Sequence, residues 1–136
     1  MTGMTKEKTM KKTMTIFLIA GVLFNVTPNL MAEDNDNGRL ISALKADNIG
    51  WRIDAARLLG EAADAEAVKP LMDVLKNDNN STARISAAVA LANIGDRSAL
   101  EALKTAAKYD TNKTVRTVST GAYIELKNLD EQIAAN

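Results

Sequence analysis

The sequence predicts an all-α protein built as a short solenoid of about three helix pairs, and three observations support this. The stretch RIDAARLLGEAAD begins at Arg52, and the similar stretch RISAAVALANIGD begins at Arg84, 32 residues later. Hydrophobic residues make up 46% of the chain but aromatic residues only 4%, so alanine fills much of the core and the helices must approach closely. The two prolines and seven glycines are too few for a turn-rich β-sandwich.

Residues 1–32 are typical of a cleavable secretory signal. Lysines precede the uncharged apolar run 14–24, and the small residue Ala32 stands at the exit. The alternatives are an uncleaved anchor and an ordinary core helix, but Asn25 interrupts the run well before the roughly 20 apolar residues that a membrane span needs. We therefore expect cleavage after Ala32, export to the periplasm or the medium of a bacterium, and no membrane span afterwards. Residues 33–37 are expected to form an acidic disordered linker.

Composition excludes several kinds of chemistry. The chain has no histidine and no cysteine, so it has no imidazole base, thiol nucleophile, disulfide or imidazole or thiolate metal site. Removing the four lysines and one glutamate of residues 1–32 leaves 13 basic and 16 acidic residues, a net charge of −3 that disfavours nucleic acid binding. EDNDNG at Glu33 resembles the start of a calcium loop, but Leu44 stands where the bidentate glutamate is required. We expect no catalytic residue, no metal site and no cofactor.

The repeat covers an entire 32-residue unit. Comparison of residues 52–83 with residues 84–115 gives twelve identities without a gap, and Arg116 opens a third copy. A fixed period of this length indicates a solenoid. A single helix pair cannot bury its apolar face, whereas stacked pairs share one continuous core.

Each unit contains two helical patterns separated by a polar break. Val68, Leu71 and Leu75 recur at helical spacing in a first helix, and Ala55 and Leu59 do so in a second. The breaks KNDNNSTA and KYDTNKTV are rich in residues that favour turns and cap helix N-termini. We expect a repeat domain over residues 38–128 and a C-terminal cap or tail over 129–136. The expected helices span residues 38–46 and 51–62, 65–77 and 82–94, and 97–108 and 114–127.

These units resemble HEAT repeats, in particular the short bacterial HEAT-like repeats named from phycobilisome lyases. The shared pattern is an aliphatic helix, Asp, a polar turn, Val-Arg, two alanines, Ala-Leu-Gly and Ile-Gly-Asp, as in LMDVLKNDNNSTARISAAVALANIGD. Ser119 and Thr120 replace the two alanines in the third copy. The resemblance implies a right-handed α-solenoid of about three HEAT-like helix pairs. It also implies a structural Asp–Arg ladder that ties the turns together, rather than an anion or metal site. The ladder residues are Asp47, Arg52, Asp78, Arg84, Asp110 and Arg116.

The resemblance also implies that the helices beginning with the repeated arginine line a concave surface. The second and fifth positions after each arginine avoid the Ala/Leu stripe, so they face either solvent or a partner. We expect a partner-binding strip made of Asp54, Arg57, Ile85, Ser86, Val89 and Val118. The expected function is a non-catalytic protein-binding or scaffold module of the periplasm or cell envelope, acting as a monomer on a protein partner. The alternatives are an ordinary surface with some inter-repeat packing, and a bilin lyase or isomerase suggested by the resemblance alone.

Overall fold

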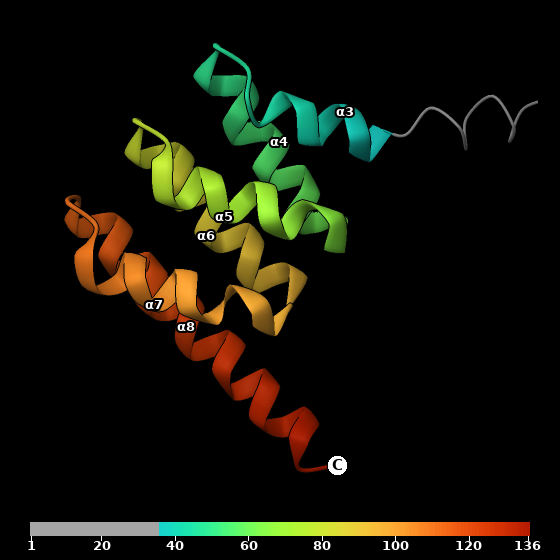
Figure 1. Cartoon of the computed structure of the whole chain (residues 1–136), viewed down its shortest axis with the longest axis vertical. Coiled ribbons are helices and arrows are strands. Elements are labelled where there is room, and N and C mark those ends of the chain that lie inside the picture. The colour runs from blue at the N-terminus through green and yellow to red at the C-terminus, as the bar shows by residue number, and fades with distance from the viewer. Residues whose placement is uncertain (1–35) are drawn as a thin grey trace, which may run out of the picture. The chain divides into compact units, whose positions relative to one another are not determined.

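The computed structural model describes residues 36–136, which form one compact unit. The expected signal and residues 33–35 of the expected linker lie outside the described residues. Within 36–136 the chain forms six α-helices, two short 3-10 helices and no strand (Figure 1). The elements are α3 (Asp36–Ala43), α4 (Ile49–Glu61), η1 (Ala65–Ala67), α5 (Val68–Asn77), α6 (Ser81–Ile94), η2 (Arg97–Ala99), α7 (Leu100–Tyr109) and α8 (Lys113–Ala134).

The helices form three successive pairs, in which α3 packs against α4, α5 against α6, and α7 against α8. Successive pairs lie one beside the next along the unit, from α3 to α8 (Figure 1). The second helices are direct neighbours, because α4 packs against α6 and α6 packs against α8. The predicted all-α solenoid is therefore confirmed.

Asparagine caps begin the second helix of every pair. The side-chain oxygen of Asn80 accepts hydrogen bonds from the backbone N–H groups of Thr82 and Ala83, and Asn112 caps α8 in the same way. Asn48 accepts a hydrogen bond from a backbone N–H in the first turn of α4. Such caps satisfy N–H groups that have no partner inside the helix, and their 32-residue spacing fixes where each second helix starts.

The core is made of leucines separated by small residues. Leu59, Leu71 and Leu91 are fully buried, and alanines fill the space between neighbouring second helices. The closest approach is between Gly60 in α4 and Ala90 in α6, where a Cβ added to the glycine would lie 2.7 Å from the Ala90 Cα. Close approach of backbones increases the contact between α4 and α6 despite the scarcity of large side chains.

The helix boundaries differ from the predicted ones at both ends of the unit. The structure starts α3 at Asp36, so the last two residues of the expected linker are helical, and it ends α3 at Ala43. At the other end α8 continues past the predicted end at 127 and includes most of the expected tail. The turn after α6 uses Gly95 with a φ of 75°, but Lys127 occupies the equivalent position in the third pair and the helix continues through it.

The extended part of α8 packs back on the preceding turn. Leu126 is fully buried, and the Leu129 Cδ2 atom lies 3.1 Å from the position of a Cβ built on Gly95. The Asp130 Oδ1 atom lies 3.7 Å from the Nε atom of Arg97 at the start of η2. Between residues 36 and 136, no helix combines the length and the apolar character that a membrane crossing requires.

Candidate binding surfaces

Arginines connect each helix pair to the next, and the same contacts recur along the unit. Arg84 Nε donates to Asp110 Oδ2 at 2.8 Å and Arg84 Nη2 donates to Asp110 Oδ1 at 2.9 Å. Its third nitrogen, Nη1, donates to the backbone oxygen of Asp78 at 2.8 Å. Arg52 binds the Asp78 carboxylate in the same two-pronged way, at 2.7 and 3.1 Å. Each arginine therefore joins the turn of its own pair to the turn of the next, as the predicted ladder requires.

The ladder aspartates are held in their charged form. Burial raises the pKa of Asp110. The hydrogen bonds from Arg84 and from the Asn112 backbone N–H, together with the charges of Arg84 and Arg116, lower this pKa by more than burial raises it. The net pKa of Asp110 lies below its ordinary value, and the pKa of Asp78 shifts in the same direction for equivalent reasons. Paired carboxylates buried between two turns have a structural explanation, so they do not indicate an anion or metal site.

The prediction that Asp47 belongs to this ladder is only partly right. Asp47 accepts a hydrogen bond from Arg52 through its backbone oxygen, at 3.0 Å, and Ala46 accepts one at 2.8 Å. Ala46 occupies the position equivalent to Asp78, because each lies six residues before the arginine that binds its backbone oxygen. Within residues 36–136 no hydrogen bond or ion pair engages the Asp47 carboxylate.

The last arginine of the ladder uses one edge of its guanidinium. Arg116 Nη1 donates to the backbone oxygens of Asp110 and Thr111, at 2.8 and 3.2 Å. Among the described residues its Nε and Nη2 atoms have no carboxylate partner. The predicted ladder residue Arg116 is thus in place, and its carboxylate-binding edge is open.

The expected partner-binding strip includes a shallow cavity between α4 and α6. Val89 is 45% exposed, so this side chain lies at the surface and not in the core. The cavity has a volume of about 320 Å³. Its lining is mainly apolar and includes the charged side chains of Arg57 and Glu61. Its lining residues are Ile53, Arg57, Glu61, Ile85, Ser86, Val89, Ala90 and Asn93.

The structure brings together only part of the strip. Arg57, Ile85, Ser86 and Val89 share the cavity, whereas Val118 on α8 is partly buried against the core and does not line it. Asp54 stands at the margin, with its carboxylate 3.9 Å from the Arg57 Nε atom.

Arg57 also has a partner on its own helix. Its Nη1 donates to Glu61 Oε1 at 2.8 Å, and both side chains are more than half exposed. Exposed pairs of this kind contribute little to stability, so these charges are available to an approaching partner.

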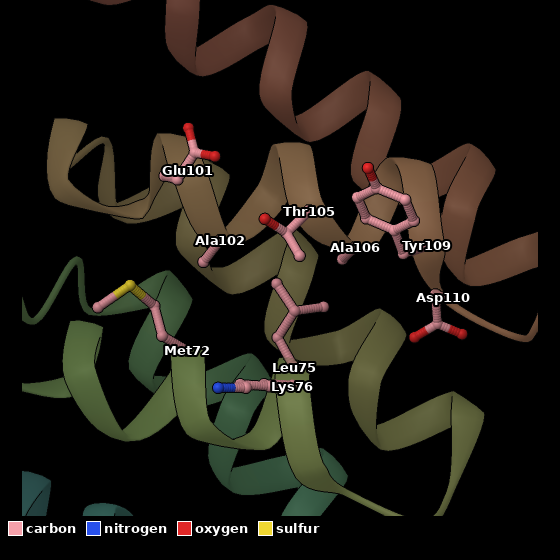
Figure 2. A pocket seen from close by; sticks show the side chains of 9 residues that line it. All are labelled: Met72, Leu75, Lys76, Glu101, Ala102, Thr105, Ala106, Tyr109 and Asp110. Carbon is pink, nitrogen blue, oxygen red and sulfur yellow. The ribbon is translucent and has the colours of Figure 1, made fainter.

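A second cavity lies on the opposite helices, between α5 and α7, and has a volume of about 410 Å³. Figure 2 shows Met72 and Leu75 of α5 below this space, and Ala102 and Thr105 of α7 above it. Tyr109 stands at one end and is largely exposed. The cavity is predominantly apolar, and Lys76, Glu101, Ala106 and Asp110 complete its lining.

Comparison with known protein families adds the decisive observation. A family described as HEAT repeats matches residues 38–123, well over half of the chain. The chain belongs to the HEAT-repeat family. Comparison with curated proteins finds none that matches it.

The sequence interpretation missed the cavity on the outer HEAT helices. Leu75 belongs to the predicted apolar stripe and is buried, whereas Met72, which lines the cavity with it, is only partly buried. A signal was present on the following helix, where residues 102, 105, 106 and 109 recur at helical spacing beside the core stripe. Among residues 36–136 no group of three or more acidic side chains could hold a metal ion.

Proposed function

We propose that this HEAT-repeat chain is a non-catalytic protein-binding or scaffold module of the periplasm or cell envelope. The cavity between α4 and α6 carries the proposal, because an apolar centre with a charged margin is the anatomy of protein interaction sites. HEAT repeats commonly serve as scaffolds for protein interactions, which agrees with this assignment.

The chemistry of the cavity indicates what kind of partner segment would bind. Ile85 and Val89 offer an apolar surface for one side chain of modest size. Arg57 and Glu61 stand beside it as a charge pair that can open to bind a charged or polar group of the partner. A segment with an apolar anchor next to such a group fits both features.

The test is the substitution Val89→Asp, which puts a carboxylate at the centre of the cavity. Because Val89 is largely exposed, the variant should keep its helicity and melting temperature. Partner binding should weaken, because a charge buried in an interface without a counter-charge is costly. Pull-downs from the native cell envelope, compared with circular dichroism of the same variants, measure the two effects separately.

The matched control is Glu101→Lys on the outer helix α7, where the glutamate side chain is 81% exposed. This variant should affect partner binding less than Val89→Asp. If Val89→Asp unfolds the protein, the residue belongs to the core. If it leaves binding intact, the strip is not the site, and the cavity in Figure 2 becomes the better candidate.

The proposed location rests on the sequence pattern of residues 1–32. Sequencing the N-terminus of the protein isolated from its native source should give a start near Glu33. Soluble cytoplasmic protein that begins at Met1 or Met10 would contradict export.

The bilin lyase or isomerase alternative, and the assignment to the phycobilisome-lyase type of repeat, rest on sequence resemblance. A coloured chromophore that co-purifies with the protein would favour this alternative over a scaffold.

A further inference from the structure

The repeat leaves an apolar surface at the start of the stack. The Trp51 side chain is 67% exposed, whereas Ala83 and Val115, which occupy the same position in the second and third pairs, are 0% exposed. Leu58 is also exposed, although the equivalent Ala90 is buried against α4. The later residues are buried because a preceding second helix covers them, and within residues 36–136 no such helix precedes α4.

A complementary surface lies at the other end of the stack. Gly60 and Ala92 face the following second helix and are buried, but the equivalent Ile124 in α8 is 51% exposed. The same helix carries Arg116, whose carboxylate-binding edge is open. The two ends are therefore the two halves of an interface that the chain already forms twice, between α4 and α6 and between α6 and α8.

Charge at the two ends agrees with this pairing. Each internal ladder arginine binds a carboxylate in the turn of the next pair. At the start of the stack, Asp47 lies next to the ladder position, and its carboxylate accepts no hydrogen bond among the described residues. The hydrogen bond with Asp78 raises the pKa of Arg52, and the Asp47 carboxylate lies near enough to that arginine to raise its pKa further. A second copy that follows α8 would bring Asp47 towards Arg116.

We propose that copies of this chain associate head to tail, with α8 of one copy packed on α4 of the next. Ile124 contacts Leu58, and Arg116 faces the turn that contains Asp47. Because the contacting surfaces differ, each addition leaves a free end unless the rotation between copies closes a ring. Ile124 and Leu58 are larger than the internal pair Gly60 and Ala90, so the helices stay further apart and association is weaker and reversible.

The proposal is tested with residues 33–136, which contain the compact unit and every residue that the structure describes. Sedimentation velocity over a concentration series should show a weight-average sedimentation coefficient that rises beyond that of a dimer. Trp51 is the sole tryptophan of the chain, so its emission should shift to the blue over the same concentrations. A monomer at every concentration up to the solubility limit, or growth that stops at a dimer, would overturn the proposal.

Two variants of α8 form a matched pair. Ile124→Glu places a charge at the stacking position and should weaken association by about tenfold or more. Ile133→Glu makes the same change at another exposed position of the helix and should leave association unchanged. Both isoleucines are exposed, so both variants should remain folded. Equal effects of the two variants would contradict the proposed register.

A gain of association tests the role of the arginine. Ala46→Asp installs a carboxylate at the ladder position of the first turn and should strengthen association. Combining it with Arg116→Gln should cancel the gain, and an undiminished gain would mean that Arg116 is not the contact. Arg57→Glu, in the partner-binding strip, should leave self-association unchanged, which separates this interface from the one under Proposed function.

Discussion

Replacing Gly60 by alanine tests the close approach of α4 and α6. The added Cβ would lie 2.7 Å from the Ala90 Cα and 2.9 Å from the Ala90 Cβ. Because the nearer atom belongs to the backbone, no side-chain rotation relieves the contact and one helix must move. Overpacking costs about 1–3 kcal/mol, which is partly offset by the roughly 1 kcal/mol that alanine gains over glycine in a helix. We expect Gly60→Ala to lower the free energy of unfolding by up to about 2 kcal/mol.

Gly121 provides a matched control in α8. The same Cβ built there meets no atom within 4 Å, so only the helix propensity changes. Gly121→Ala should therefore raise the free energy of unfolding by about 0.5–1 kcal/mol. Urea denaturation followed by circular dichroism measures both variants, and an unchanged slope shows that the unfolded state is comparable.

A double variant separates the two contacts of the added atom. Ala90→Gly in the Gly60→Ala background removes the contact with the Ala90 Cβ but leaves the contact with its Cα. The free energy of unfolding of the double variant should therefore not return to that of the unaltered protein. The reasoning would be refuted if Gly60→Ala stabilised the protein as much as Gly121→Ala does, because α4 and α6 would then not be in close contact.

Other substitutions test the core and the ladder. Leu71→Ala or Leu91→Ala should cost about 2–5 kcal/mol in urea denaturation, since both side chains are fully buried, and a cost below about 0.5 kcal/mol would contradict the core assignment. Ser119→Ala should stabilise the protein by about 1 kcal/mol, because the buried hydroxyl has no hydrogen-bond partner among residues 36–136; destabilisation would show that the hydroxyl is satisfied. The folded-state pKa of Asp78 and Asp110 is lowered, so their stabilising effect is present above the unfolded pKa of about 3.9 and is lost as the pH falls through the folded value. Urea midpoints measured at decreasing pH should thus fall less steeply for Asp110→Asn than for the unaltered protein, and equal slopes would exclude this contribution.

The fold could be predicted because one signal recurs at every level. The repeated arginines, the asparagine caps and the Ala/Leu stripes share the same 32-residue spacing. The helix positions predicted in one unit therefore agree with those predicted in the next. The residues of the arginine ladder were predictable for the same reason, but their pairing was not, because Arg84 binds the carboxylate of Asp110 and only the backbone oxygen of Asp78.

The parts that failed are those where the repeat is broken. Alanine stands at position 46, where the later turns have Asp78 and Asp110, so Asp47 lies one residue after the ladder position. At Lys127 the third unit lacks a residue with positive φ, so α8 continues where α6 turned at Gly95. A repeat pattern predicts the common features of its copies and carries no information about how one copy departs from them.

The cavities could not be predicted, because they depend on side-chain volumes across two helices. The depth of the space beside Met72 is set by the distance between α5 and α7, which the spacing of apolar residues does not determine. The partner-binding strip shows the same limit, since the pattern placed Val89 at the surface but could not exclude Val118 from the cavity.

The ladder has a consequence for how such a protein can change its length. Arg52 binds Asp78 and Arg84 binds Asp110, so each arginine finds its carboxylate 26 residues further along the chain. Duplicating a whole 32-residue unit would keep this separation for every pair, and the added unit would bring both its own arginine and the carboxylate for its predecessor. Inserting or deleting one residue in a turn would shift a carboxylate away from its arginine. The ladder therefore tolerates growth in whole units and disfavours growth in smaller steps.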